Sequence, residues 1–189
     1  MCSVRHHQST PTSADLDGLD VLDVCHRHML IHLGKLAALV SRLGRHGADA
    51  EARVLAGEIL RFFATTSREH HEDEERHVFP KLLAAADAVT MQAVERLRQD
   101  HFWLEEDWSE LAPELDALAS GQSWVDIDVL REQVEVFTAL SQDHIALEES
   151  LIYPQARAAL AKDERLEMGR EMAARRRAAR HADGTSRRR

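Results

Sequence analysis

The chain has 189 residues, a formal charge of −9, and 44% hydrophobic but only 5% aromatic residues. This is the length of one domain with a tail, and 8 glycines and 4 prolines are too few for the many turns of an all-β chain. Two cysteines offer no disulfide framework, and no run approaches the roughly eighteen apolar residues of a membrane span. We therefore expect an all-α, cytoplasmic protein that does not enter a membrane.

The charge is unevenly distributed along the chain. Residues 170–189 contain eight arginines and two acids, so residues 1–169 carry a formal charge of −15. An acidic body disfavours nucleic acid as a partner. We expect residues 1–16 to be a flexible N-terminus, residues 17–160 to form the folded domain, and residues 161–189 to form a basic C-terminal helix and tail.

Two long amphipathic helices are predicted in the first half of the chain. Apolar residues three or four apart indicate a helix over about residues 17–43, which ends at a glycine-containing stretch. The same spacing predicts a second helix over about residues 50–79. Pro80 follows it, and proline breaks or kinks a helix.

Two more long helices are predicted in the second half. The third has its apolar stripe over residues 91–115, and Pro113 is expected to bend it or end its regular part. The fourth covers about residues 125–153, with Pro154 as its stop. A shorter basic helix is expected over residues 163–179. Four long helices with short connections predict an antiparallel, up-down-up-down four-helix bundle, followed by a short basic helix and tail.

Each of the four apolar stripes is interrupted by a histidine. The four are His26, His70, His101 and His144. The axis of a bundle is an expensive place for an imidazole. Because neighbouring helices run in opposite directions, and these histidines lie early in the first and third helices but late in the second and fourth, all four should meet at one end of the bundle.

The second and fourth helices also carry an internal repeat. At a spacing of 74 residues, His70, Glu74, Glu75 and Pro80 correspond to His144, Glu148, Glu149 and Pro154. His101 and Glu105 repeat the spacing between histidine and glutamate in the third helix. A spacing of four places both side chains on one helix face, about 6 Å apart along the axis, so both can reach the same metal pair.

These residue types are typical of ligands for iron or manganese. Mixed imidazole and carboxylate donors suit octahedral sites, and no cysteine lies in these positions to select zinc. Two ions have about twelve coordination positions. Four histidines, the bridging carboxylates Glu74 and Glu148, and an oxo or hydroxo bridge fill about ten of them. A seventh residue would leave one position for dioxygen, nitric oxide or peroxide, and an open position makes a metal site reactive.

The sequence lacks the motifs of two other kinds of metal site. A ferritin-like site needs two Glu-x-x-His elements and a glutamate from each of two further helices. Only one such element was found, in Glu74 with His77. The His-Glu-x-x-His string of zinc proteases is absent from the sequence.

Over about residues 19–154 the sequence resembles the hemerythrin-like, or HHE cation-binding, family. The strings that carry the resemblance are Cys25-His26, HHEDEERHVFP over 70–80, DHFWLEEDW over 100–108 and HIALEESLIYP over 144–154. The resemblance implies a four-helix bundle with two non-haem iron ions joined as Fe–O–Fe, manganese being the alternative metal. The ligands that it implies are His26, His70, Glu74, His101, His144 and Glu148.

The seventh ligand departs from the family pattern. Hemerythrin proper has a second histidine four residues after the first in its third helix, where this chain has Glu105. Some relatives use the residue after the histidine of the second helix, which is His71 here. We rank Glu105 above His71, because position 105 shares the stripe of His101 whereas position 71 is turned about 100° from His70.

Several other polar residues have simpler interpretations. We expect Glu75 and Glu149 to be either solvated or acceptors for imidazole N–H groups, and Asp100 to have only a helix-surface role. His28 is expected to be solvated. Tyr153 should lie more than two turns from the metal, because it follows His144 by nine residues.

Three functional hypotheses follow from the resemblance. In the first, a di-iron protein binds dioxygen or a related small oxidant, in a role such as oxygen, iron or redox sensing. In the second, suggested by Glu105, the centre is an oxidase or a nitric oxide or peroxide reductase, because a carboxylate is a harder donor that favours the ferric state. In the third, iron only stabilises a regulatory bundle that contacts partners through its arginine-rich tail.

Overall fold

The computed structural model describes residues 16–84, 87–122 and 124–186. Every regular element within these ranges is helical, so the predicted all-α class is confirmed. Residues Leu22–Ala159 form one compact unit, and the chain before Leu22 forms a second unit with the chain from Leu160 onward. Apart from Leu16, the expected flexible N-terminus lies outside the described residues.

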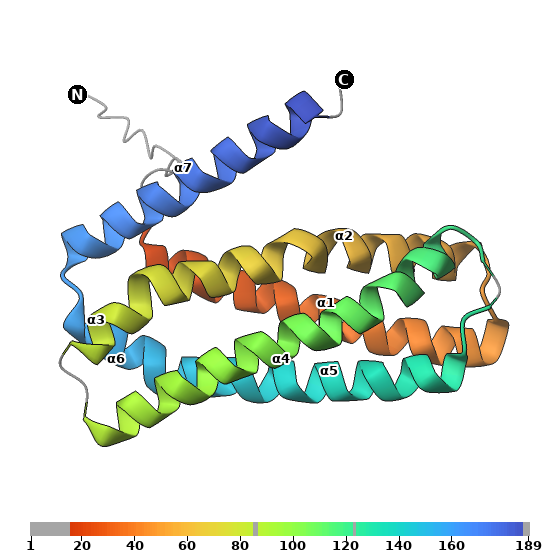
Figure 1. The fold of residues 1–189 in the computed structure, drawn as a ribbon, viewed down its shortest axis with the longest axis horizontal. Helices are drawn as coiled ribbons and strands as arrows, with labels where there is room; N and C mark the ends of the chain where they lie inside the picture. The colour runs from red at the N-terminus through yellow and green to blue at the C-terminus, as the bar shows by residue number, and fades with distance from the viewer. Residues whose placement is uncertain (1–15, 85–86, 123, 187–189) are drawn as a thin grey trace, which may run out of the picture. The chain divides into compact units, whose positions relative to one another are not determined.

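Four long helices build the unit Leu22–Ala159. The elements in chain order are α1 Gly18–His46, α2 Ala50–Asp73, the π-helical segment η1 Glu74–Val78, α3 Phe79–Leu83, α4 Ala88–Ala119, α5 Ile127–Leu147, the π-helical segment η2 Glu148–Ile152, α6 Tyr153–Ala159, and α7 Lys162–Ser186. In Figure 1, α1, α2, α4 and α5 lie side by side and alternate in chain direction. This arrangement is consistent with the predicted four-helix bundle.

Short-range capping explains where several of these helices begin and end. The side chains of Asp49 and Asp87 each accept a backbone N–H at 2.8 Å, from Ala52 and Thr90, at the starts of α2 and α4. Such caps satisfy N–H groups that have no partner within the helix. Gly47, with φ of 67°, follows α1. Only glycine adopts this left-handed conformation without strain, so it provides a natural helix end.

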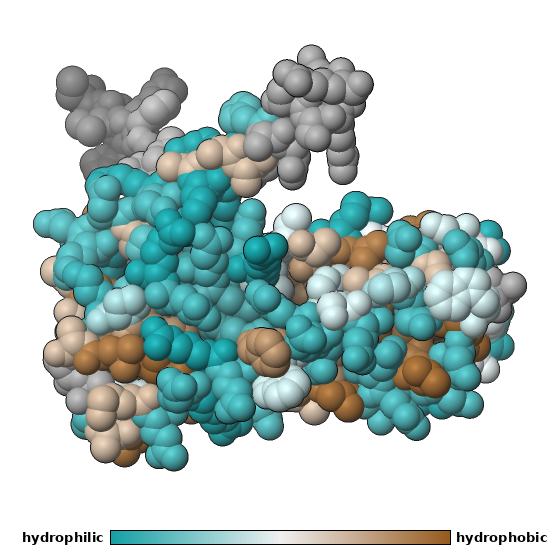
Figure 2. Space-filling model, viewed as in Figure 1, coloured by the Kyte–Doolittle hydropathy of each residue, from teal (hydrophilic) through white to brown (hydrophobic). Residues whose placement is uncertain are grey.

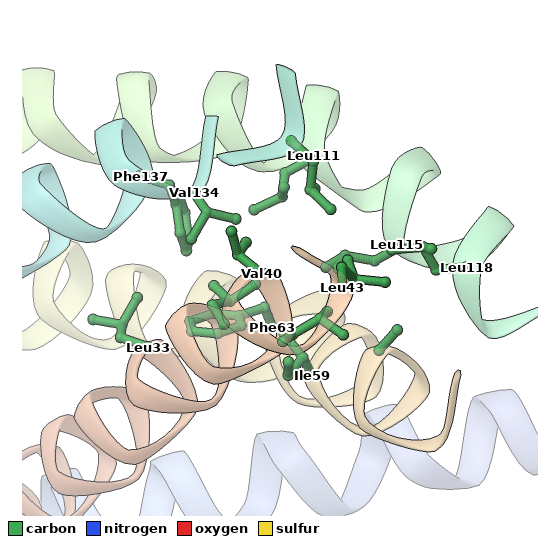
Figure 3. Close-up of a cluster of buried hydrophobic side chains, with 14 of the residues drawn as sticks. Leu33, Val40, Leu43, Ile59, Phe63, Leu111, Leu115, Leu118, Val134 and Phe137 are labelled. Atoms are coloured by element: carbon green, nitrogen blue, oxygen red, sulfur yellow. The ribbon is translucent and has the colours of Figure 1, made fainter. Parts of the chain in front are cut away.

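One apolar cluster of the core occupies one half of the bundle's length, and further buried apolar residues such as Leu22, Leu97 and Ile152 lie in the other half. The cluster's buried side chains come from all four long helices (Figure 3): Leu33, Leu36, Leu39, Val40 and Leu43 of α1, Ala52, Ala56, Ile59 and Phe63 of α2, Leu104, Leu111, Leu115 and Leu118 of α4, and Leu130, Val134 and Phe137 of α5. The four histidines predicted to converge lie in the other half of each helix. The four histidines therefore lie in the half of the bundle away from this apolar cluster.

Pro154 does not end its helix, contrary to the prediction, and Pro80, which was predicted to break or kink its helix, does not break it. Each follows a π-helical segment, in which the N–H of Phe79 bonds to the carbonyl of Glu74 five residues back, and the equivalent bond forms in η2. Proline lacks an N–H, and its ring crowds the carbonyl four residues back. The wider π turn relieves that clash. The helical path therefore continues past each proline into α3 and α6.

Two further boundaries can be compared with the prediction. Pro113, predicted to bend the third helix or end its regular part, lies inside α4, which continues to Ala119. The basic helix α7 runs over Lys162–Ser186, longer than the predicted 163–179. It is held to the start of α1 by Arg165, which donates to Asp17 at 2.6 Å.

The surface is mostly polar on the face shown in Figure 2, where hydrophobic residues lie in small groups among hydrophilic ones. Within the described ranges, each helix is too short or too polar to pass through a bilayer. The large apolar side chains are thus concentrated in the interior, although some, such as Val54 and Phe102, are exposed.

Candidate metal centre

Four buried histidines, one from each long helix, come together beyond the apolar core. They are His26 of α1, His70 of α2, His101 of α4 and His144 of α5. None has more than 4% of its surface exposed. The Nε2 atoms of His26 and His70 are 2.9 Å apart, close to the separation of about 3 Å between neighbouring donors of an octahedral ion with bonds of about 2.1 Å.

Two fully buried carboxylates lie between these histidines. Glu74 and Glu148 are the first residues of η1 and η2. The distances from carboxylate oxygen to histidine Nε2 are 3.1 Å from Glu148 Oε2 to His26, 3.2 Å from Glu148 Oε1 to His144, 3.4 Å from Glu74 Oε1 to His70, and 3.5 Å from Glu74 Oε2 to His101. Each carboxylate thus faces histidines from two helices, as a bridging ligand would.

Several of these atoms have no hydrogen-bond partner, which tests the fit to a metal. They include both carboxylate oxygens of Glu148, Oε2 of Glu74, and Nε2 of His101 and His144. A buried polar atom without a partner costs about 1–3 kcal/mol. The donors form three overlapping groups in which all donor atoms lie within 4.8 Å of one another: His26, His70, Glu74 and Glu148; Glu74, His101, His144 and Glu148; and His71, His101 and His144. The residues therefore fit metal ions well.

The centre includes His71 and not Glu105, so our ranking of these two residues is not supported. His71 is 5% exposed, and its ring stacks on that of His101 with centroids 4.0 Å apart. Glu105 is exposed and belongs to none of the three groups. The inward-facing surface of a bundle helix is at least 100° wide. Consecutive residues such as His70 and His71 can therefore both face the interior.

Tyr153 also lies in the centre, where the sequence argument placed it too far away. Its hydroxyl donates to Glu74 Oε1 at 2.6 Å and lies 3.2 Å from His26 Nε2, and its ring stacks on the His26 ring at 5.1 Å. Helical side chains lean toward the N-terminus, and Tyr153 follows Glu148 by five residues, which is one π turn. The sequence signal was the repeat, since Phe79 stands 74 residues earlier and stacks on His101.

Two outer carboxylates orient the imidazoles, which was one of their two predicted roles. Glu75 Oε1 lies 2.8 Å from Nδ1 of His101, and Glu149 Oε1 lies 3.2 Å from Nδ1 of His26. An N–H at Nδ1 leaves the lone pair of Nε2 free for a metal. Each copy of the repeat thus supplies two successive glutamates. The first, Glu74 or Glu148, faces histidines from two helices, and the second, Glu75 or Glu149, contacts Nδ1 of one histidine.

Asp100 has more than the expected surface role. It is buried, and its Oδ2 lies 3.8 Å from Nδ1 of His144. Arg96 lies 3.6 Å from the same oxygen. The Asp100 carboxylate therefore lies next to the outer nitrogen of His144, a third histidine of the centre, although the distance of 3.8 Å is too long for a hydrogen bond.

The histidines divide into two electrostatic classes. Burial lowers the pKa of His70 to about 3 and that of His71 well below its usual range. Burial also lowers the pKa of His26 and His101, but hydrogen bonds to glutamates, together with their charges, more than offset it, so both values are raised. His70 and His71 are therefore neutral, which is the form that binds a metal.

The two inner carboxylates cannot both be ionised at low cost. Burial and the charge of Glu74 raise the pKa of Glu148 well above its usual range. Burial favours the neutral form of Glu74 as well, but the neighbouring imidazoles, His70 first and then His101, lower its pKa well below normal. Such a split is typical of neighbouring buried carboxyls. A cation between them would allow both to ionise.

Comparisons with known proteins point to a cation-binding family. The family described as the hemerythrin HHE cation binding domain matches residues 17–156, which include every residue of the centre. A protein of Haemophilus influenzae (strain ATCC 51907 / DSM 11121 / KW20 / Rd), described as an uncharacterized protein, is 33% identical over 158 residues. These are 84% of this chain and 89% of that protein.

Proposed function

The chain belongs to the hemerythrin HHE cation-binding family, and from that premise we propose that it binds two non-haem iron ions and one small oxidant. The oxidant would be dioxygen, nitric oxide or peroxide. The observation that supports the proposal is the group of five buried histidines around two buried, shared carboxylates. Manganese accepts the same donor types, and the test below separates the two metals.

The donors divide unequally between the two ions. One ion would have His71, His101 and His144, the other would have His26 and His70, and both would share Glu74 and Glu148. If one small ligand also bridges the ions, octahedral preference leaves one position without a protein donor. That position falls on the ion of His26 and His70, and the oxidant would bind there.

The five-histidine set changes the balance between the functional hypotheses. Oxidase or reductase activity was suggested by Glu105, because a carboxylate donor favours the ferric state. Glu105 is exposed and outside the donor groups, and His71, an imidazole, would take the seventh place. Binding of the oxidant is therefore the function that we favour over turnover, with sensing of oxygen, iron or redox state as its biological role.

Iron loading tests the proposal directly. Metal-free protein is incubated with ferrous iron without oxygen, desalted, analysed for iron and then exposed to air. We expect two irons per chain and new absorption bands from iron–ligand charge transfer when air is admitted. A parallel loading with Mn²⁺ should give weaker retention. Fewer than two irons, or an unchanged spectrum in air, would refute the proposal.

Tyr153→Phe should weaken iron retention while leaving the fold intact. The variant removes the hydrogen bond to Glu74 Oε1 but keeps a ring that can stack on His26. Loss of a group that supports a ligand typically costs about 10–100-fold in metal affinity. Competition against a graded series of chelators measures the change. The thermal midpoint of the metal-free variant is the control, and retention equal to that of the original chain would contradict the prediction.

A further inference from the structure

A surface cavity of about 470 Å³ opens onto the metal centre. His71 and His101 form part of its lining, together with the glutamates at 72, 75 and 105 and the arginines at 68 and 76. His71 is 95% buried, as its 5% exposure implies, and its Nδ1 has no hydrogen-bond partner. A donor of the centre therefore faces a space that solvent can reach.

The cavity lies on one side of the centre. His71 and His101 belong to the ion with three histidines, whereas His26 and His70 are not among the lining residues. The cavity thus leads to the ion that would be held by three histidines, and that ion would have no open coordination position. An oxidant that binds at the open position gains nothing from this cavity, but an incoming metal ion does.

The charges of the cavity favour a cation at its mouth. Arg76 and Glu72 form an ion pair at 2.7 Å and largely cancel. The remaining groups are two carboxylates, Glu75 and Glu105, against the single guanidinium of Arg68. Glu105 and Arg68 form no ion pair or hydrogen bond within the described part of the chain. Carboxylate oxygens are suitable donors for a hydrated divalent ion.

We propose that ferrous iron reaches the centre through this cavity, with Glu105 as the first residue that binds it. The proposal rests on the proposed di-iron function. Along the path, two exposed carboxylates precede a buried imidazole. Glu105 is exposed, the side chain of Glu75 is 47% exposed and holds Nδ1 of His101, and His71 is buried. An ion can exchange water for protein donors one step at a time, so it never crosses an apolar barrier unligated.

The test compares rates of iron uptake in three single variants. Metal-free protein is mixed with Fe²⁺ without oxygen at low salt, and unbound iron is captured at set times with a chromogenic chelator. Glu105→Gln should slow uptake several-fold, and Arg68→Gln should accelerate it. Glu106→Gln is the matched control, because Glu106 is exposed on the same helix but does not line the cavity. High salt should shrink the differences, because it screens exposed charges.

The outcomes separate this proposal from the one on which it rests. If every variant finally binds two irons and the rates differ as stated, both proposals stand. Equal rates for Glu105→Gln and Glu106→Gln, or slower uptake in Arg68→Gln, would overturn the uptake path while the di-iron function stands. If the unaltered chain binds fewer than two irons at the end point, the proposed function fails instead.

Discussion

Replacing His70 by alanine should remove iron from the centre and the stabilisation that bound iron gives to the fold. His70 is fully buried, and its Nε2 lies 2.9 Å from Nε2 of His26 and 3.4 Å from Glu74 Oε1. Without it, one ion keeps a single histidine. A ligand at about 100 times its dissociation constant stabilises the folded state by about 2.7 kcal/mol. Its loss should lower the thermal midpoint by roughly 5–10 °C in a domain of this size.

The same substitution should lower the thermal midpoint much less in the metal-free protein. Nδ1 of His70 has no hydrogen-bond partner, so without metal the alanine variant loses only the hydrogen bond of Nε2 with His26 and removes a buried nitrogen that is unpaired. Iron content and the thermal midpoint, each measured with and without iron, separate these effects. His28→Ala is the control, because His28 is exposed on α1. His144→Ala should behave like His70→Ala, and equal iron loss from all three variants would show that burial does not decide which histidines bind.

Helical periodicity explains why the helices and the four histidines could be predicted. The predicted second helix begins at residue 50, as α2 does, and the first was expected over 17–43 against Gly18–His46 in the structure. Apolar residues that repeat every three or four positions mark one face. A histidine on that face must therefore lie inside. The convergence of His26 and His101 follows from their positions along antiparallel helices.

The π turns could not be predicted from that periodicity. A regular helix places residues 3.6 to a turn, so Tyr153 is carried away from Glu148 on a helical wheel. The π segment that begins at Glu148 closes a hydrogen bond five residues apart, from the N–H of Tyr153 to the carbonyl of Glu148, and the Tyr153 side chain lies in the centre against Glu74 and His26. Pro154 indicates that the regular helix is interrupted, but a helix can accommodate proline by a break, a kink or a wider turn. Only the packing of the whole bundle selects among them.

The positions of Glu105 and His71 were misjudged because a helical wheel treats the inner face as a narrow line. Near the axis of a four-helix bundle, side chains must fill a space between four backbones, and positions 100° apart on one helix can both point into it. His71 does so beside His70. Position 105 follows His101 by one turn, yet it is exposed. A place on the same helical stripe as His101 therefore does not ensure that a side chain is buried.

Replacing His71 by alanine should accordingly cost far more iron than replacing Glu105 by alanine. His71 completes a group with His101 and His144 in which the donor atoms lie within 4.8 Å of one another, and its loss leaves that ion one imidazole short. We expect His71→Ala to retain at most one iron after desalting. Glu105→Ala should reach two irons at equilibrium, because its carboxylate acts only on the rate of uptake.

Electron paramagnetic resonance provides a second measurement for this comparison. The one-electron-reduced di-iron state, whose hyperfine coupling reports directly bound imidazole nitrogen, should be lost in His71→Ala together with the second iron and should form unchanged in Glu105→Ala. Neither change depends on the oxidant, so the comparison identifies the ligand without assuming a reaction. Loss of an iron from Glu105→Ala with two irons kept by His71→Ala would restore the carboxylate as the seventh ligand. It would also restore the argument from Glu105 for oxidase or reductase activity.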